Sequence, residues 1–111
     1  MSERERRLGR NEALFREAND RIERMTETLQ ATTETFRILC ECGVESCTEQ
    51  IVVQMSEYER IRADSELFFV CSGHEQPDVE EVVEYHEDYN VVRKGSGEAA
   101  RLAHETDPRD Q

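Results

Sequence analysis

The sequence predicts an α+β fold: a long N-terminal helix followed by a small antiparallel β module with one short helix. Three observations predict it. Apolar residues recur at heptad spacing near the N-terminus, the pattern then changes to the alternation typical of strands, and three of the four cysteines fall within eight positions. A chain of 111 residues has room for one compact domain and its appendages.

Residues 1–35 are expected to form an amphipathic helix, well defined from about Asn11 to Thr32. One heptad position holds Leu8, Phe15, Ile22, Leu29 and Phe36, and its partner position holds Ala18 and Met25. The β-branched run that begins at Thr32 should end the helix. So narrow a seam needs a covering surface, which is the chain's own compact part, a second copy in a coiled coil, or another protein. The contact residues expected on this seam are Phe15, Ile22, Met25 and Leu29.

Residues 36–95 are expected to form the compact β-rich module. The alternating segment "FRILCEC", the turn "GVES" and the segment "CTEQIVVQM" predict a hairpin around the cysteines. In "SEYERIRAD", Ser56 as N-cap and Glu59 three residues later form a capping box, which predicts a short helix.

The second half of the module reads as three further strands. The apolar run from Leu67 to Cys71 predicts one strand, and the Val- and Tyr-rich segments 79–85 and 89–94 predict a hairpin around "HED". A helical turn after Pro77 is the alternative for the first arm of that hairpin. Residues 96–111 are expected to form a flexible tail with a possible short helix.

The charge balance argues against nucleic acid as a partner. The net charge is −12, and residues 36–95 carry fourteen Asp or Glu against five Lys or Arg. Such a surface repels phosphate backbones. The chain has no apolar run long enough to span a membrane and no apolar stretch behind its basic N-terminus, so we expect a cytoplasmic protein. In that compartment clustered cysteines favour metal binding or redox chemistry over structural disulfides.

The cysteines predict a metal site. Cys40 and Cys42 are two residues apart in a predicted strand, which places both sulfurs on one face, and Cys47 returns after the turn at Gly43. His74 follows a predicted strand and is the expected fourth ligand of a structural Cys3His zinc site. Cys71 is the competing fourth ligand, although its apolar surroundings favour a place in the core. Unliganded cysteines and an iron–sulfur or redox role are the other interpretations.

No motif in the sequence predicts catalysis. The patterns of serine hydrolases, P-loops, dinucleotide folds and zinc proteases are absent, and His86 and His104 lie beside acidic groups where solvated histidines are common. We therefore expect a non-enzymatic interaction or regulatory adaptor that is stabilised by zinc. The alternative is a thiol redox switch in which oxidation of the cysteine cluster releases the metal.

Four sequence blocks carry a family resemblance. In order they are "CECG…CTEQI", "SEYERIRAD", "FFVCSGHE" and "VVRK…GEAARLAHETDPR". With them the chain, from about Asn11 to Arg109, resembles a family of small uncharacterised actinobacterial proteins with a CxCx4C…GH motif. The resemblance implies that His74 is the fourth ligand, because Cys71 departs from the family pattern. It implies no activity.

Overall fold

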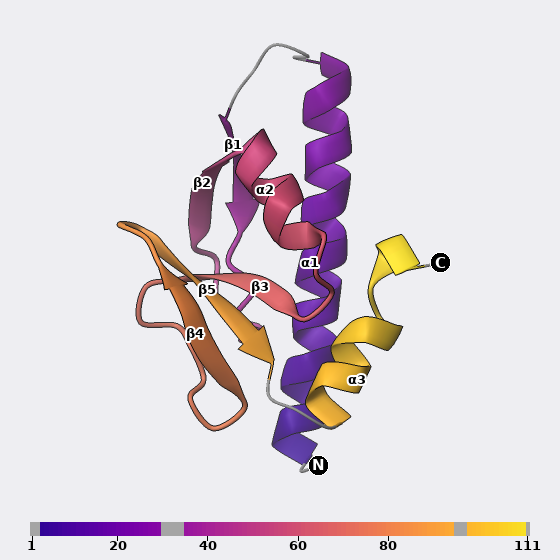
Figure 1. The fold of residues 1–111 in the computed structure, drawn as a ribbon, viewed down its shortest axis with the longest axis vertical. Coiled ribbons are helices and arrows are strands. Elements are labelled where there is room, and N and C mark those ends of the chain that lie inside the picture. The colour runs from indigo at the N-terminus through magenta and orange to yellow at the C-terminus, as the bar shows by residue number, and fades with distance from the viewer. Residues whose placement is uncertain (1–2, 30–34, 95–97, 111) are drawn as a thin grey trace.

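The computed structural model describes residues 3–29, 35–94 and 98–110, and it confirms the α+β prediction (Figure 1). The long helix α1 runs along one side of the molecule, with two small sheets and the short helix α2 on one side of it and α3 beside its N-terminal half. In chain order the elements are α1 (Glu3–Leu29), β1 (Thr35–Leu39), β2 (Gln50–Gln54), α2 (Met55–Arg62), β3 (Leu67–Cys71), β4 (Glu80–Tyr85), β5 (Tyr89–Lys94), α3 (Glu98–Glu105) and the 3-10 turn η1 (Pro108–Asp110).

The strands form two antiparallel sheets, as the alternation patterns predicted. β1 pairs with β2, and the buried positions of the two strands face one another, with Ile38 opposite Ile51. The second sheet has the order β3–β5–β4. The hairpin predicted around "HED" is therefore β4–β5, and its register shifts between Val82 and Glu84. Such an irregularity makes the exposed edge of β4 a poorer template for pairing with another chain.

The short helix α2 joins the two sheets through one aromatic side chain. Tyr58 is fully buried, meets the Phe36 ring edge-on at 5.4 Å and stacks on the Phe69 ring at 5.5 Å. Phe36 comes from β1 and Phe69 from β3, so this stack makes one continuous core from two small sheets. The predicted cap of α2 is wrong, since its N-cap is Gln54, which makes no side-chain capping bond.

The helix α1 is longer at its N-terminus than expected, and its buried face is polar. It begins at Glu3 and ends at Leu29, while the predicted end at Thr32 lies outside the described residues. Up to residue 25, where the side chains of α1 are described, the fully or nearly fully buried ones are charged or amide groups at helical spacing: Glu12, Arg16, Asn19, Asp20 and Glu23. This part of α1 therefore contacts the module mainly through polar groups, to which Ile22 adds a contact with the hydrophobic core.

The predicted apolar seam divides between the core and the surface. Ile22 packs against the hydrophobic core and Phe15 is half-buried, whereas Met25 is 63% exposed. Leu14, which lies next to the seam, is also 63% exposed. The side chain of Leu29 lies outside the described residues.

The short helix expected within the flexible tail of residues 96–111 is present in the described residues 98–110. The segment forms α3 and η1, and Asp107 is only 4% exposed because it accepts a hydrogen bond from Arg62 at 2.8 Å. Arg109 donates to Glu23 of α1 at 3.0 Å and pairs with Glu59 of α2 at 2.7 Å. The sequence alone did not reveal this order because each partner is distant along the chain. Within the described residues, no helix is both long and apolar enough to cross a membrane.

Candidate metal centre

The cysteine segment follows β1, where a glycine lets the chain turn. The predicted strand over "FRILCEC" is too long, because β1 ends at Leu39 and Cys40 extends the ladder by one hydrogen bond, from its N–H to the Glu49 carbonyl at 3.0 Å. Gly43 has φ +82°, in the left-handed region that side chains disfavour, and its carbonyl accepts a hydrogen bond from Asn11 of α1 at 2.9 Å. The long helix thus braces the loop that carries the thiols.

The histidine reaches the thiols from a turn after β3. Gly73 has φ +89°, and the His74 N–H donates to the Cys71 carbonyl at 2.9 Å, which closes the turn. This turn brings the His74 Nδ1 atom to 3.5 Å from the Cys40 sulfur and 3.6 Å from the Cys47 sulfur. The structure therefore brings together the residues that the sequence placed in one site.

The four groups fit a tetrahedral ion. The ligand atoms of Cys40, Cys42, Cys47 and His74 all lie within 4.8 Å of one another. Zinc bonds of about 2.3 Å to sulfur and about 2.0–2.1 Å to imidazole nitrogen, at tetrahedral angles, require a sulfur–nitrogen separation of about 3.6 Å. The two separations to Nδ1 match that value. The cluster could therefore bind a metal such as zinc, with Nδ1 as the imidazole donor.

The surroundings of the Cys40 and Cys42 sulfurs disfavour the thiolate form unless a cation is present. Cys40 and Cys42 are 2% and 1% exposed, and burial raises the pKa of both thiols. Backbone N–H groups act in the opposite direction: the Cys71 amide donates to the Cys40 sulfur at 3.2 Å, and the Val44 amide donates to the Cys42 sulfur. Such donors stabilise bound thiolates and orient them toward a metal.

The centre opens on one side to the surface. A groove of about 380 Å³ is lined in part by Cys42, Cys47 and His74, and its rim carries Glu49 and Gln76. Cys40 does not line this groove. A metal held by the four groups would thus be buried on the side of Cys40 and approachable from the side of Cys47.

Cys71 lies at the edge of the centre and only partly in the core. It is half-buried, packs against the hydrophobic cluster and donates its backbone N–H to the Cys40 sulfur at 3.2 Å. It is not one of the four residues whose ligand atoms lie within 4.8 Å of one another. The sequence analysis treated Cys71 either as a metal ligand or as a core residue, and it did not anticipate a position between the two.

A second cluster, which sequence reasoning missed, is an ion-paired group on the surface. The ligand atoms of Glu57, Glu84 and His86 lie within 4.8 Å of one another, but Arg60 bonds both carboxylates, reaching Glu84 at 2.7 and 2.9 Å. The hydrogen bonds from Arg60 lower the pKa of Glu84 to about 2. His86 also stacks on Tyr89 at 4.5 Å. The arginine already supplies the positive charge that an ion would bring.

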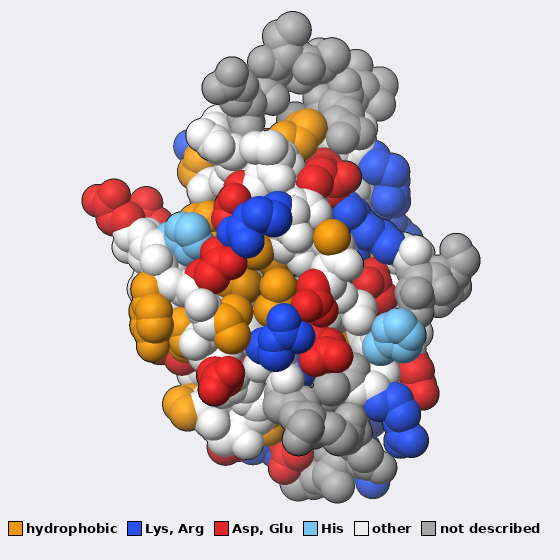
Figure 2. Space-filling model, in the orientation of Figure 1, with side chains coloured by type: hydrophobic (Ala, Val, Ile, Leu, Met, Phe, Trp, Pro, Cys, Tyr) orange, Lys and Arg blue, Asp and Glu red, His pale blue; other side chains and the backbone are white. Residues whose placement is uncertain are grey.

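Figure 2 shows this pattern of mixed charges over one face, with hydrophobic side chains gathered on the left over the β3–β5–β4 sheet.

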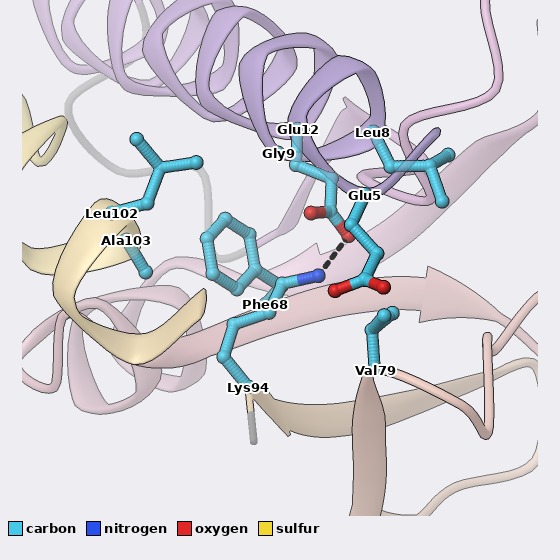
Figure 3. A pocket seen from close by; sticks show the side chains of 9 residues that line it. All are labelled: Glu5, Leu8, Gly9, Glu12, Phe68, Val79, Lys94, Leu102 and Ala103. Atoms are coloured by element: carbon cyan, nitrogen blue, oxygen red, sulfur yellow. Dashed lines mark hydrogen bonds and ion pairs between the residues drawn. The ribbon is translucent and has the colours of Figure 1, made fainter. Parts of the chain in front are cut away.

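Behind α1 lies a small cavity that holds a buried lysine. Lys94 bonds the Glu12 carboxylate, and its ammonium group lies 5.3 Å from the centre of the Phe68 ring (Figure 3). It also bonds the Glu80 carboxylate at 2.8 Å. The cavity has a volume of about 20 Å³, enough for one water molecule. Burial raises the pKa of Glu12 to about 8. Lys94 lowers this pKa, but the neighbouring Glu80 carboxylate shares the same cation and raises the pKa again. The cluster is a structural charge site, too small for an organic ligand.

The chain was compared with protein families, curated proteins and solved structures. No family profile, curated protein or solved structure matches the chain. The resemblance to the actinobacterial family therefore has no support from these comparisons, and the geometry of the centre is the only evidence for its chemistry.

Proposed function

We propose that the chain is a non-enzymatic interaction or regulatory adaptor whose β-rich module is held together by a structural zinc ion. The observation that carries the proposal is that three sulfurs and the His74 Nδ1 atom lie within 4.8 Å of one another, with Nδ1 at 3.5 and 3.6 Å from the Cys40 and Cys47 sulfurs, as a tetrahedral zinc requires. Four protein ligands leave no open position for a substrate, which favours a structural role for the metal over a catalytic one.

The position of the centre explains why a metal would stabilise this fold. Its ligands come from the β1–β2 connection and from the turn after β3, so one ion would link the two sheets. Among the residues that the structure describes, the hydrophobic core contains sixteen buried side chains. Small domains with limited cores often depend on a metal or a disulfide in this way.

Metal analysis tests the zinc proposal. The full chain, purified without added metal, is expected to contain about one equivalent of zinc, and a strong chelator is expected to lower its melting temperature by at least about 10 °C. His74→Ala should reduce the metal content, whereas His86→Ala, a histidine outside the centre, should leave it unchanged. A chain that holds less than about half an equivalent and melts identically with chelator would contradict the proposal.

The adaptor role rests on the exposed part of α1. Leu14 and Met25 are each 63% exposed and stand eleven residues apart, which is about three helical turns and places them on one face. We assign to this face a partner helix, supplied by another protein or by a second copy of the chain. Ile22 is unsuitable for a test because it packs against the core. Met25→Asp should abolish association without changing the melting temperature, as measured by light scattering and by binding to a co-purified partner; a monomer that keeps its partner despite the substitution would contradict the assignment.

A redox switch is a second candidate, favoured by the groove. The Cys47 side chain is half-buried and lines the opening, and its sulfur lies within 4.8 Å of the Cys42 sulfur. A hydroperoxide entering there would be reduced while the two sulfurs form a disulfide, which removes two ligands from the metal. This candidate predicts stoichiometric zinc release by mild peroxide that a thiol reductant reverses, and zinc retention under peroxide would exclude it.

A further inference from the structure

We propose that the exposed face of α1 binds an acidic helix of another protein, whose carboxylates pair with a row of arginines. The inference rests on the adaptor role proposed above, which assigns to this face a helix of either another protein or a second copy, and it names the chemistry of that partner. Successive residues of an α-helix are rotated by about 100°, and the positions of this face together span only about 100° of the circumference. We call the face the basic stripe; its side chains are exposed, apart from the half-buried Glu17, and belong to Glu3, Arg6, Arg7, Arg10, Leu14, Glu17, Arg21, Arg24 and Met25.

The basic stripe carries positive charge on an acidic protein. It contains five arginines and two glutamates, a net charge of +3, whereas the whole chain has a net charge of −12. Glu17 pairs with Arg21 at 2.9 Å, and both side chains remain largely exposed. Among the described residues, no carboxylate pairs with Arg7 or Arg10. The stripe therefore holds positive charge that the described part of the chain does not neutralise.

The arginines of the stripe lie beside its two apolar side chains. Arg10 precedes Leu14 by four residues, which places the two side chains one helical turn apart. Arg21 precedes Met25 by the same interval. The second pair follows the first after eleven residues, a repeat that stays close to one line along an α-helix. A helix lying along this line can place apolar residues on Leu14 and Met25, while carboxylates on its flank meet the two arginines.

The charge of the stripe disfavours a second copy of α1 as the partner. Two α1 helices packed along their basic stripes would bring five arginines of one copy against five of the other. Like charges that face one another across an interface repel and suppress association. An acidic helix meets the same arginines with attraction, so the charge pattern selects a different protein.

A single helix also fits the stripe better than a membrane or a nucleic acid does. A helix that lies on a membrane needs a broad apolar face, and the stripe offers only Leu14 and Met25. The wider phosphate surface of a duplex would come close to the acidic module, which repels it. A helix of about 10–12 Å in diameter can contact the stripe alone.

Peptide binding to the full chain tests the inference. The probe is a fluorescent peptide of three heptads with Leu at the core positions and Glu at the flanking positions, and its neutral counterpart has Gln in place of each Glu. With the labelled peptide held at nanomolar concentration, fluorescence anisotropy measures its affinity for the chain. We expect the wild type to bind the acidic peptide at least about tenfold more tightly than the neutral one, and added salt to weaken this binding.

Charge reversal locates the binding on the stripe. Arg10→Glu combined with Arg21→Glu should weaken binding of the acidic peptide at least about tenfold, because both groups then repel its carboxylates. Arg37→Glu, which reverses an exposed arginine of β1, is the matched control and should change the affinity less than about twofold. The three side chains are exposed, so the melting temperature should stay near that of the wild type. Should the double variant fail to fold, Arg10→Gln with Arg21→Gln replaces it, with an expected loss of at least about threefold.

The other outcomes overturn the inference in distinguishable ways. Equal binding of the two peptides that is lost in Met25→Asp would show docking by apolar contact alone, and the adaptor role would survive without its acidic partner. Binding of neither peptide at about 1 mM chain would overturn the inference and the adaptor role together. Phosphatidylserine vesicles or duplex DNA bound as tightly as the acidic peptide would reveal a general polyanion site in place of the proposed one. A wild-type dimer in light scattering that Met25→Asp dissociates would make a second copy the partner.

Discussion

The Asn19 side chain makes both hydrogen bonds of a strand partner with Leu39. Its amide oxygen accepts the Leu39 N–H at 2.7 Å, and its amide nitrogen donates to the Leu39 carbonyl at 2.9 Å. The same nitrogen donates to the buried Glu41 carboxylate at 2.8 Å. A helix side chain thus satisfies the last residue of β1 immediately before the cysteines begin, and it fixes the direction in which the chain leaves the strand.

Removal of this amide should destabilise the whole chain. In Asn19→Ala the N–H and carbonyl of Leu39 lose their partner in a site where Asn19 itself is fully buried. Buried polar groups left without partners cost about 1–3 kcal/mol each, so we expect a loss of about 3 kcal/mol in the free energy of unfolding by urea titration. Arg21→Ala, which removes only an exposed pair with Glu17, should cost less than about 0.5 kcal/mol. Equal effects of the two substitutions would contradict the prediction.

The two left-handed glycines offer a matched pair. A Cβ at Gly43 would lie 2.8 Å from the Leu8 carbonyl oxygen of α1, whereas a Cβ at Gly73 would meet nothing within 4 Å. Gly73→Ala should therefore cost only the left-handed strain of about 1–2 kcal/mol. Gly43→Ala adds a clash with helix backbone, so its loss of stability and its loss of bound metal should both be larger. Thermal melting with zinc analysis measures this, and similar effects at the two positions would show that α1 does not brace the cysteine loop.

The buried arginine Arg62 should be far more important for stability than an exposed one. It is 1% exposed and bonds both oxygens of Asp20, at 3.0 and 2.7 Å, together with Asp107. Arg62→Met removes the cation that Asp20 and Asp107 share and leaves Asp20 with Arg109 alone, at 3.1 Å, so we expect a loss of about 3–5 kcal/mol. Arg93→Ala removes two exposed ion pairs and should cost less than about 1 kcal/mol. Urea unfolding of both variants checks the contrast, which a loss below 1 kcal/mol for Arg62→Met would refute.

The glutamate pair around Lys94 predicts a fall of stability with rising pH. Burial raises the pKa of Glu12 from 4.5 to about 8, so between these values the folded chain holds a proton that the unfolded chain has lost. Stability from this group is therefore complete below about pH 4.5 and declines until about pH 8, by up to about 5 kcal/mol. Glu12→Gln mimics the protonated group and should flatten this slope in urea unfolding measured at pH 5, 6.5 and 8. An unchanged slope would contradict the prediction.

The sequence predicted the parts of the structure that depend on near neighbours. The strand Leu67–Cys71 and the β4–β5 hairpin were predicted correctly because runs of β-branched and aromatic residues carry a local signal. The cysteines were brought together correctly even though the strand assignment was wrong. Only four residues separate Cys42 from Cys47, and the turn at Gly43 limits where their sulfurs can lie.

The rest depends on charges that meet only in three dimensions. Glu12, Arg16 and Asp20 look like the solvated face of a helix when the sequence is read alone, yet each is buried. The partners of Asp20 lie 38 to 89 residues away, so no periodicity reveals them. The same reason applies to the C-terminal segment, whose polar composition suggested a tail although Asp107 and Arg109 complete this network.

The polar docking of α1 also determines how uniquely the helix is seated. A one-residue slip rotates a helix by about 100° and moves it by about 1.5 Å, and a smooth hydrocarbon stripe tolerates such sliding far better than hydrogen bonds do. Here the Asn11 amide donates to the carbonyl of Gly43, and the Asn19 amide bonds the N–H and carbonyl of Leu39, so two amides about two turns apart fix both the rotation and the height of the helix. In any other position of the helix, buried carboxylates and guanidinium groups would lie in the interior without hydrogen-bond partners. Only one position of α1 on the module therefore satisfies these groups, and the direction of its exposed face is fixed relative to the module.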